Sequence, residues 1–256
     1  MKFCNVAGRR IEYVRQPSSH PREGAPAMVF LHEGLGSTAM WRDFPQRVAD
    51  ACGCETVVYS RHGHGRSEAL GEPRRPDYMH REALVALPDF LDQLHIERPI
   101  LLGHSDGASI ALIHAGAARR PVTAAIVMAP HVMVEDATLA GIRVARQAWS
   151  DSDLKRRLGK YHPDPERVFF DWHDTWLDSS FRAWNIEEYL APIACPVLAI
   201  QGEDDEYATM EQIERIGRQC RDVELVRLAD CRHSPHKDQL QLVIDTVAGF
   251  VGRLLD

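Results

Sequence analysis

The sequence lacks the features that would assign it to several special classes of protein. It has no apolar run of about 18 residues, so we expect no membrane-spanning helix. The first residues, MKFCNVAGRRIEYV, lack the apolar stretch of a signal peptide, and we expect two short strands there. Basic residues form no patch and the formal net charge is −7, which argues against a nucleic-acid partner. With no repeats or low-complexity linkers, the chain is expected to be an ordinary globular protein of the cytoplasm.

Cysteine is sparse and poorly spaced for a metal site. Cys52 and Cys54 have a single residue between them, which is tighter than the usual zinc spacing. No second pair of cysteine or histidine residues has the spacing of a partner pair. We therefore expect no bound metal, and free, mostly buried thiols in a reducing compartment. The six cysteines are Cys4, Cys52, Cys54, Cys195, Cys220 and Cys231.

Short aliphatic runs alternate with amphipathic stretches along most of the 256 residues. Unbroken aliphatic runs are typical of parallel strands that are covered on both faces, and the alternation predicts a doubly wound α/β sheet. Pro88 predicts a kink in one of the helices. We expect strands at residues 27–32, 56–60, 100–103, 124–129, 197–202 and 224–228, and helices at 78–94, 105–118 and 238–255.

The alternation fails once, in a segment that holds four of the five tryptophans. A helix is expected to start within it, because Asp164 suits an N-cap and Pro165 suits the first helical position. Phe169, Trp172 and Trp176 would then share one face of that helix. We expect residues 131–190 to form a helical cap over the strand ends, and residues 1–130 and 191–256 to form the core domain.

The stretch ILLGHSDGASIAL, residues 100–112, joins a predicted strand to a predicted helix through a small polar pentapeptide. One interpretation is a tight turn, since glycine, serine and aspartate are ordinary turn residues. The other is a nucleophile elbow, in which Gly-x-Ser-x-Gly holds Ser105 in a strained conformation so that its hydroxyl can react. A serine nucleophile also needs a base and a carboxylate that orients the base.

Both residue types follow, in the order serine, aspartate, histidine. The stretch AIQGEDDEYAT places Asp204 and Asp205 directly after a predicted strand. The stretch LADCRHSPHKDQL places His233 and His236 between the last strand and the last helix, where His236 also suits the opening of a helix. Open α/β sheets build their sites at the carboxyl ends of parallel strands. The pattern alone leaves the choice within each pair open.

The stretches FLHEGLGS, YSRHGHGRS, GHSDGAS, IQGEDDEY and CRHSPHKDQ together resemble the α/β-hydrolase fold family. The resemblance covers essentially the whole chain and implies Ser105 as nucleophile, His233 as base and Asp205 as the orienting acid. It also implies an oxyanion hole made by the backbone N–H groups of Gly34 and Asp106.

The activity that this resemblance implies is a serine hydrolase that cleaves a small-molecule carboxylic ester through an acyl-enzyme, without a cofactor. Cleavage of lactones, thioesters, amino-acid esters or carbon–carbon bonds stays open, because the same residues serve all of these reactions. The alternative from another class is a ligand-binding receptor that kept the fold and lost turnover.

The sequence also departs from the family pattern and offers further candidate substrate-binding residues. Glu33 stands where the family commonly has glycine, and its side chain could face the pocket or the solvent. The Asp106 side chain resembles that of valacyclovir hydrolase-like enzymes, where it binds a substrate amine; the alternative is local hydrogen bonding. His131 is expected near the pocket rim. Trp172 and Trp176 either line the pocket or pack within the cap.

Overall fold

The computed structural model describes residues 1–69, 71 and 74–256, and these build one eight-stranded sheet. The strand order is β1-β2-β4-β3-β5-β6-β7-β8. Strands β1, β2 and β4 pair antiparallel, and all pairings from β4 through β3 to β8 are parallel. The strands are β1 Lys2–Val6, β2 Arg9–Gln16, β3 Met28–Leu31, β4 Thr56–Tyr59, β5 Ile100–His104, β6 Ala124–Met128, β7 Val197–Gly202 and β8 Val223–Leu228.

Every aliphatic run expected to form a strand does so, within one residue at each end. The two strands expected at the N-terminus are also present, as β1 and β2. The central strands are buried on both faces because alternate side chains enter different cores. In β3, for example, Val29 and Leu31 join one core cluster while Met28 and Phe30 join the other.

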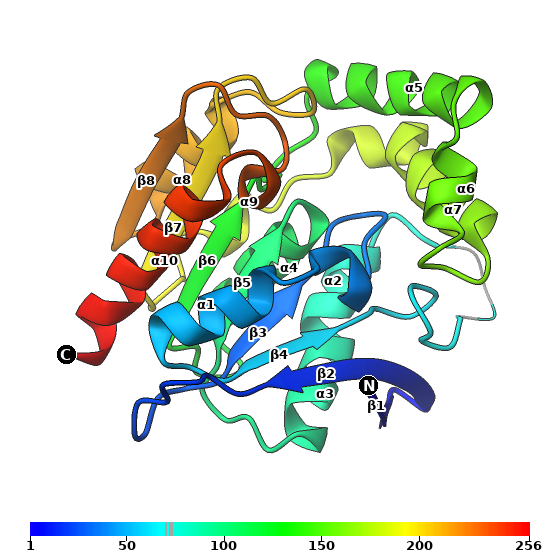
Figure 1. Cartoon of the computed structure of the whole chain (residues 1–256). Helices are drawn as coiled ribbons and strands as arrows, with labels where there is room; N and C mark the ends of the chain where they lie inside the picture. The colour runs from blue at the N-terminus through cyan, green and yellow to red at the C-terminus, as the bar shows by residue number, and fades with distance from the viewer. Residues whose placement is uncertain (70, 72–73) are drawn as a thin grey trace.

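Helices cover both faces of the sheet (Figure 1). One face packs against α1 and α10, and the other packs against α3, α4 and α8. The predicted doubly wound α/β class is therefore confirmed. The helices are α1 Phe44–Cys52, α2 Tyr78–Arg81, α3 Leu87–Gln93, α4 Asp106–Gly116, α5 Asp136–Asp151, α6 Leu154–Leu158, α7 Pro165–Leu177, α8 Glu211–Gln219, α9 Pro235–Asp238 and α10 Leu240–Leu255.

The helix expected at residues 78–94 is interrupted by a π-helical turn. This turn, Glu82–Ala86, lies between α2 and α3, and Pro88 follows in the first turn of α3. Proline has no N–H and its ring crowds the carbonyl four residues earlier, so a regular α-helix cannot run through this position unchanged. The wider turn is a known way to accommodate such a disturbance.

Residues 131–190 connect β6 to β7 and contain α5, α6 and α7. Figure 1 shows these helices at the end of the sheet toward which the parallel strands point. Helix α7 starts as expected, because Pro165 is its first residue and Asp164 Oδ1 accepts a 2.9 Å hydrogen bond from the Arg167 N–H. Phe169 and Trp176 of α7 are fully buried. The division of the chain into a core and a cap domain stays a prediction.

No helix within the described ranges combines the length and the apolarity needed to cross a membrane.

Candidate active site

The junction between β5 and α4 is strained at Ser105. Its backbone lies at φ 54° and ψ −119°, a combination that non-glycine residues rarely adopt. The flanking glycines permit a close approach of three segments. A Cβ on Gly107 would lie 1.9 Å from the carbonyl oxygen of Leu31, and one on Gly103 would lie 2.3 Å from the carbonyl oxygen of Gly107. The pentapeptide therefore has the geometry of an elbow and not that of an ordinary turn.

Three segments that are distant in the sequence bring a serine, a histidine and an aspartate into one hydrogen-bonded chain. The Oγ of Ser105 lies 2.9 Å from Nε2 of His233. The Nδ1 of His233 lies 2.9 Å from each carboxylate oxygen of Asp205. If Nδ1 carries the proton and donates to Asp205, Nε2 accepts from the serine hydroxyl. This arrangement can remove the proton from Ser105.

The Asp205 side chain is fully buried and held by two donors. Gln201 Nε2 donates to Oδ2 over 2.7 Å, and the Tyr207 N–H donates to Oδ1 over 2.8 Å. The neighbouring Asp204 is exposed, and its N–H bonds to the carbonyl of Cys231. The structure thus places Asp205, and not Asp204, beside the histidine. Sequence reasoning missed Gln201, although a glutamine inside the aliphatic run VLAIQG was a visible signal.

Neighbouring aromatic side chains support the position of His233. His104 Nε2 donates to the carbonyl oxygen of His233 over 2.7 Å. The ring of His236, in α9, lies 4.9 Å from the rings of both His104 and Trp41. Burial lowers the pKa of His236 to about 3, so this imidazole is neutral over the ordinary pH range. Of the two candidate bases, His233 is the one that contacts Ser105.

Two backbone N–H groups, those of Gly34 and Asp106, are expected to form an oxyanion hole. Asp106 is the first residue of α4, so its N–H has no acceptor within the helix. Gly34 lies in the loop after β3, and the indole of Trp172 packs directly on it. A Cβ on Gly34 would lie 2.3 Å from Cδ1 of Trp172, so glycine is required at this contact.

Buried histidines fix the peptide groups of the Gly34 loop. His64 Nε2 lies 3.0 Å from the carbonyl oxygen of Gly34, and His162 Nε2 donates to that of Leu35 over 2.9 Å. His32 Nδ1 donates to the carbonyl of Glu33 over 2.7 Å. Burial lowers the pKa of His32, His64 and His162 below the ordinary value, which favours neutral rings. Across the described part of the chain, no cluster of histidine, cysteine or acidic side chains suits a metal ion.

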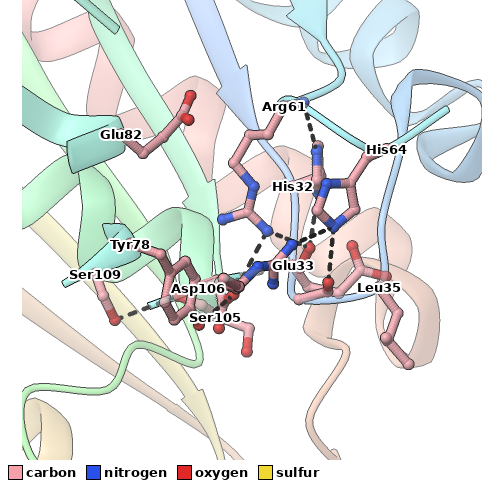
Figure 2. Close-up of polar contacts among 12 residues, drawn as sticks. His32, Glu33, Leu35, Arg61, His64, Tyr78, Glu82, Ser105, Asp106 and Ser109 are labelled. Atoms are coloured by element: carbon pink, nitrogen blue, oxygen red, sulfur yellow. Dashed lines mark hydrogen bonds and ion pairs between the residues drawn. The ribbon is translucent and has the colours of Figure 1, made fainter. Parts of the chain in front are cut away.

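The side chain of Asp106 is buried and engaged by neighbours. Its Oδ2 accepts a 2.7 Å hydrogen bond from the Tyr78 hydroxyl and lies 3.5 Å from Nη2 of Arg61 (Figure 2). Trp176 Nε1 in turn donates to the Tyr78 oxygen over 3.1 Å. Sequence reasoning missed Arg61 and Tyr78. Only Arg61 gave a signal, since it directly follows an expected strand.

The remaining candidate residues lie close to the serine–histidine pair or on its loops. The buried ring of His131 lies 5.8 Å from that of His233 and 5.0 Å from that of Trp176. Burial, with a smaller effect of His233, lowers the pKa of His131 to about 4. Glu33 is half-buried and folds back over its own loop, since a Cβ on Gly36 would lie 1.9 Å from its Oε2.

Three solved structures illustrate the fold similarity. The enol-lactonase from Burkholderia xenovorans LB400 is 18% identical, with a TM-score of 0.78, over 98% of this chain and 100% of its own. Proline iminopeptidase from Mycobacterium smegmatis is 16% identical, with a TM-score of 0.79, over 99% and 98%. A meta-cleavage product hydrolase from Pseudomonas fluorescens IP01 is 15% identical, with a TM-score of 0.72, over 99% and 98%. At these identities the similarity establishes the fold.

The sequence comparison gives the family. No curated protein matches the chain in sequence. The sequence profile of the alpha/beta hydrolase family matches residues 28–246, a region that contains β3 to β8 and the connected Ser105, Asp205 and His233. The chain therefore belongs to the alpha/beta hydrolase family.

Proposed function

We propose that the protein is a serine hydrolase that cleaves a carboxylic ester of a small molecule through an acyl-enzyme on Ser105. The observation that carries this proposal is the 2.9 Å contact between Ser105 Oγ and His233 Nε2, with Nδ1 of the same ring on Asp205. A serine hydroxyl is a weak nucleophile, and a base in this position is what activates it. The strained backbone at Ser105 supports the same assignment.

This geometry supports the following reaction. Ser105 attacks the ester carbonyl while His233 takes the hydroxyl proton, and Asp205 stabilises the imidazolium that forms. The N–H groups of Gly34 and Asp106 receive the negative oxygen of the tetrahedral intermediate, an effect of about 3–4 kcal/mol for one donor. His233 then gives its proton to the leaving alcohol. A water molecule, activated by the same histidine, hydrolyses the acyl-enzyme and releases the acid.

The substrate pocket next to Ser105 is proposed to be partly aromatic. Trp172 packs on Gly34, and Trp176 contacts the ring of His131. We assign the Asp106 carboxylate to support of the elbow and not to a substrate amine, because the side chain is buried and its Oδ2 contacts Tyr78 and Arg61. A simple neutral ester is therefore a better first substrate than an amino-acid ester.

The proposal is tested by hydrolysis of p-nitrophenyl acetate and butyrate. Ser105→Ala should lower kcat by at least about 10³-fold, since removal of the nucleophile leaves only binding and the oxyanion hole. Asp205→Asn should also lower kcat, because the amide no longer holds the required tautomer of His233. Asp204→Asn is the matched control: this side chain is exposed and adjacent in sequence, and the variant should behave like the wild type.

Hydrolysis that persists in Ser105→Ala would exclude the nucleophile assignment. A wild type that binds esters, lactones and thioesters without cleaving any of them would favour a ligand-binding receptor on this fold.

A further inference from the structure

A cavity of about 110 Å³ lies beside the residues that contact Asp106. Arg61 and Tyr78 form part of its wall, and both touch the Asp106 carboxylate. Glu82, from the π-helical turn, lines another part. The volume is sufficient for a small molecule, because one water needs about 10–15 Å³ on this scale. The described lining residues also include Arg74, Arg75 and Arg81.

Arg61 is buried here without a full set of partners. Its side chain is 4% exposed. Nη2 donates to the carbonyl oxygen of Glu33 over 2.9 Å and lies 3.5 Å from Asp106. Its Nε and Nη1 atoms are buried and have no hydrogen-bond partner within the described residues. An arginine offers five donors, and leaving charged donors unsatisfied away from water is costly.

Arg74, which lines the same cavity, also has a buried nitrogen without a hydrogen-bond partner among the described residues. Its Nη2 lies 3.2 Å from Nε2 of His64, and its guanidinium stacks 4.8 Å from the centre of the Tyr78 ring. Its Nη1 is buried, and no acceptor for it occurs in the described ranges. Burial is the main cause that lowers the pKa of Arg74, and the nearby Arg61 adds to it.

The carboxylates near these two guanidiniums already accept hydrogen bonds from tyrosines, although Oδ1 of Asp106 is buried without a hydrogen-bond partner among the described residues. Asp106 accepts from Tyr78, and Glu82 accepts from the Tyr59 hydroxyl over 2.7 Å. Arg61 and Arg74 therefore place two buried like charges on one cavity wall. Among the described residues, the carboxylates that offset them are Asp106, which lies 3.5 Å from Arg61, and Asp171, which together with Asp106 acts on Arg74. Removing a charged group from water costs several kcal/mol unless an opposite charge compensates it. A negatively charged oxygen group bound between the two guanidiniums would compensate their charge.

We propose that this cavity binds a small anionic oxygen group, a carboxylate or a phosphate, between Arg61 and Arg74. The planar guanidinium matches such oxygens in geometry and can donate two parallel hydrogen bonds to them. The group can belong to the substrate itself, as a carboxylate distant from the ester, or to a free anion. Because Arg61 and Tyr78 both contact Asp106, a bound anion would also stabilise the elbow. The proposal goes beyond ester cleavage, since binding is measurable without turnover.

Calorimetric titration of the full-length Ser105→Ala protein with succinate and with inorganic phosphate tests the binding directly. Saturable binding of at least one anion is expected, and added salt should weaken it. Adding Arg74→Leu should weaken it by at least tenfold, about 1.4 kcal/mol. Arg74→Gln serves as a second variant if the leucine variant does not fold. Arg98→Leu, which removes an exposed arginine outside this cavity, is the matched control and should bind as before.

Two esters of similar length, p-nitrophenyl hemisuccinate and p-nitrophenyl butyrate, distinguish a carboxylate of the substrate from a free anion. A substrate carboxylate in the cavity predicts that Arg74→Leu raises KM for the hemisuccinate and not for the butyrate. A free anion predicts equal effects on both esters, with succinate still binding during butyrate turnover. Absence of saturable binding, or binding in the Arg74 variants that is as tight as in the Ser105→Ala protein with Arg74 intact, would overturn the proposal. A protein that binds the anion and cleaves no ester would instead refute the proposed function alone.

Discussion

At the scale of single residues, the environment of the candidate base depends on neutral imidazoles. The rings of His104 and His131 pack against His233, and the ring of His236 packs against His104. Burial is the largest cause that lowers the pKa of each of these three neighbours. They therefore act as aromatic and hydrogen-bonding supports, and add no positive charge next to a histidine that must accept a proton.

This arrangement predicts that acid destabilises the protein through His236. Its pKa falls from the ordinary 6.5 to about 3 in the folded state, with Lys237 and His233 adding to the effect of burial. The stability that the neutral His236 imidazole contributes is fully present above pH 6.5, where it is unprotonated in both the folded and the unfolded state. Below pH 6.5 the His236 imidazole is protonated in the unfolded chain but stays neutral in the folded chain. The free energy of unfolding therefore falls by up to about 1.4 kcal/mol per pH unit, down to about pH 3.

Urea unfolding of wild type and His236→Phe at pH 7 and pH 5 measures this effect. Phenylalanine keeps a ring against Trp41 and Phe44 but cannot be protonated. The variant should lose about 2 kcal/mol less than the wild type between the two pH values. His20→Gln, at an exposed position, should follow the wild type. Identical losses in wild type and His236→Phe would show that this imidazole is not the source.

At the scale of elements, the site depends on how closely β5, α4 and the end of β3 approach. Gly107 makes this approach possible, because its Cα faces the carbonyl oxygen of Leu31. His162 links the 131–190 segment to the loops after β3 and β4. Its Nε2 donates to the carbonyl oxygen of Leu35 over 2.9 Å, and its Nδ1 accepts from the Gly65 N–H over 2.9 Å. Contacts between elements, and not the elbow alone, therefore position the candidate oxyanion loop.

Gly107→Ala should destabilise the fold, because its Cβ would lie 1.9 Å from a backbone oxygen that cannot move alone. Overpacking of this kind costs about 1–3 kcal/mol, so we expect a lower melting temperature. Gly252→Ala is the control, because Gly252 lies in α10 and a new Cβ there meets open space. This variant should be more stable than the wild type by up to about 1 kcal/mol. A Gly107→Ala protein as stable as the wild type would show that α4 and β3 are not in such close contact.

At the scale of the whole molecule, local patterns predicted the sheet, the position of Ser105, and the aspartate and histidine pairs that contain Asp205 and His233. Strands buried on both faces leave an unmistakable aliphatic run, and polar residues at their carboxyl ends meet at one edge. The choices of Asp205 over Asp204 and of His233 over His236 came from the family resemblance, since the local pattern fits both members of each pair. The structure places Asp205 beside His233 and leaves Asp204 exposed.

Contacts between distant side chains could not be predicted in the same way. The Asp106–Tyr78 and Asp106–Arg61 contacts join residues 28 and 45 positions apart, and they depend on side-chain directions. The contact of His64 with Gly34 is of the same kind. Nothing in local periodicity records which way a side chain turns in a loop, so the arginine-lined cavity became visible only in three dimensions.

The central claim is that Ser105 is activated by His233, and covalent labelling with a fluorophosphonate tests it most directly. Intact-mass measurement followed by peptide mapping should find a single adduct on Ser105 in the wild type. The adduct should be absent in Ser105→Ala and should form much more slowly in His233→Ala, which lacks the base. A wild-type protein that stays unlabelled, or carries its adduct on another residue, would contradict the account.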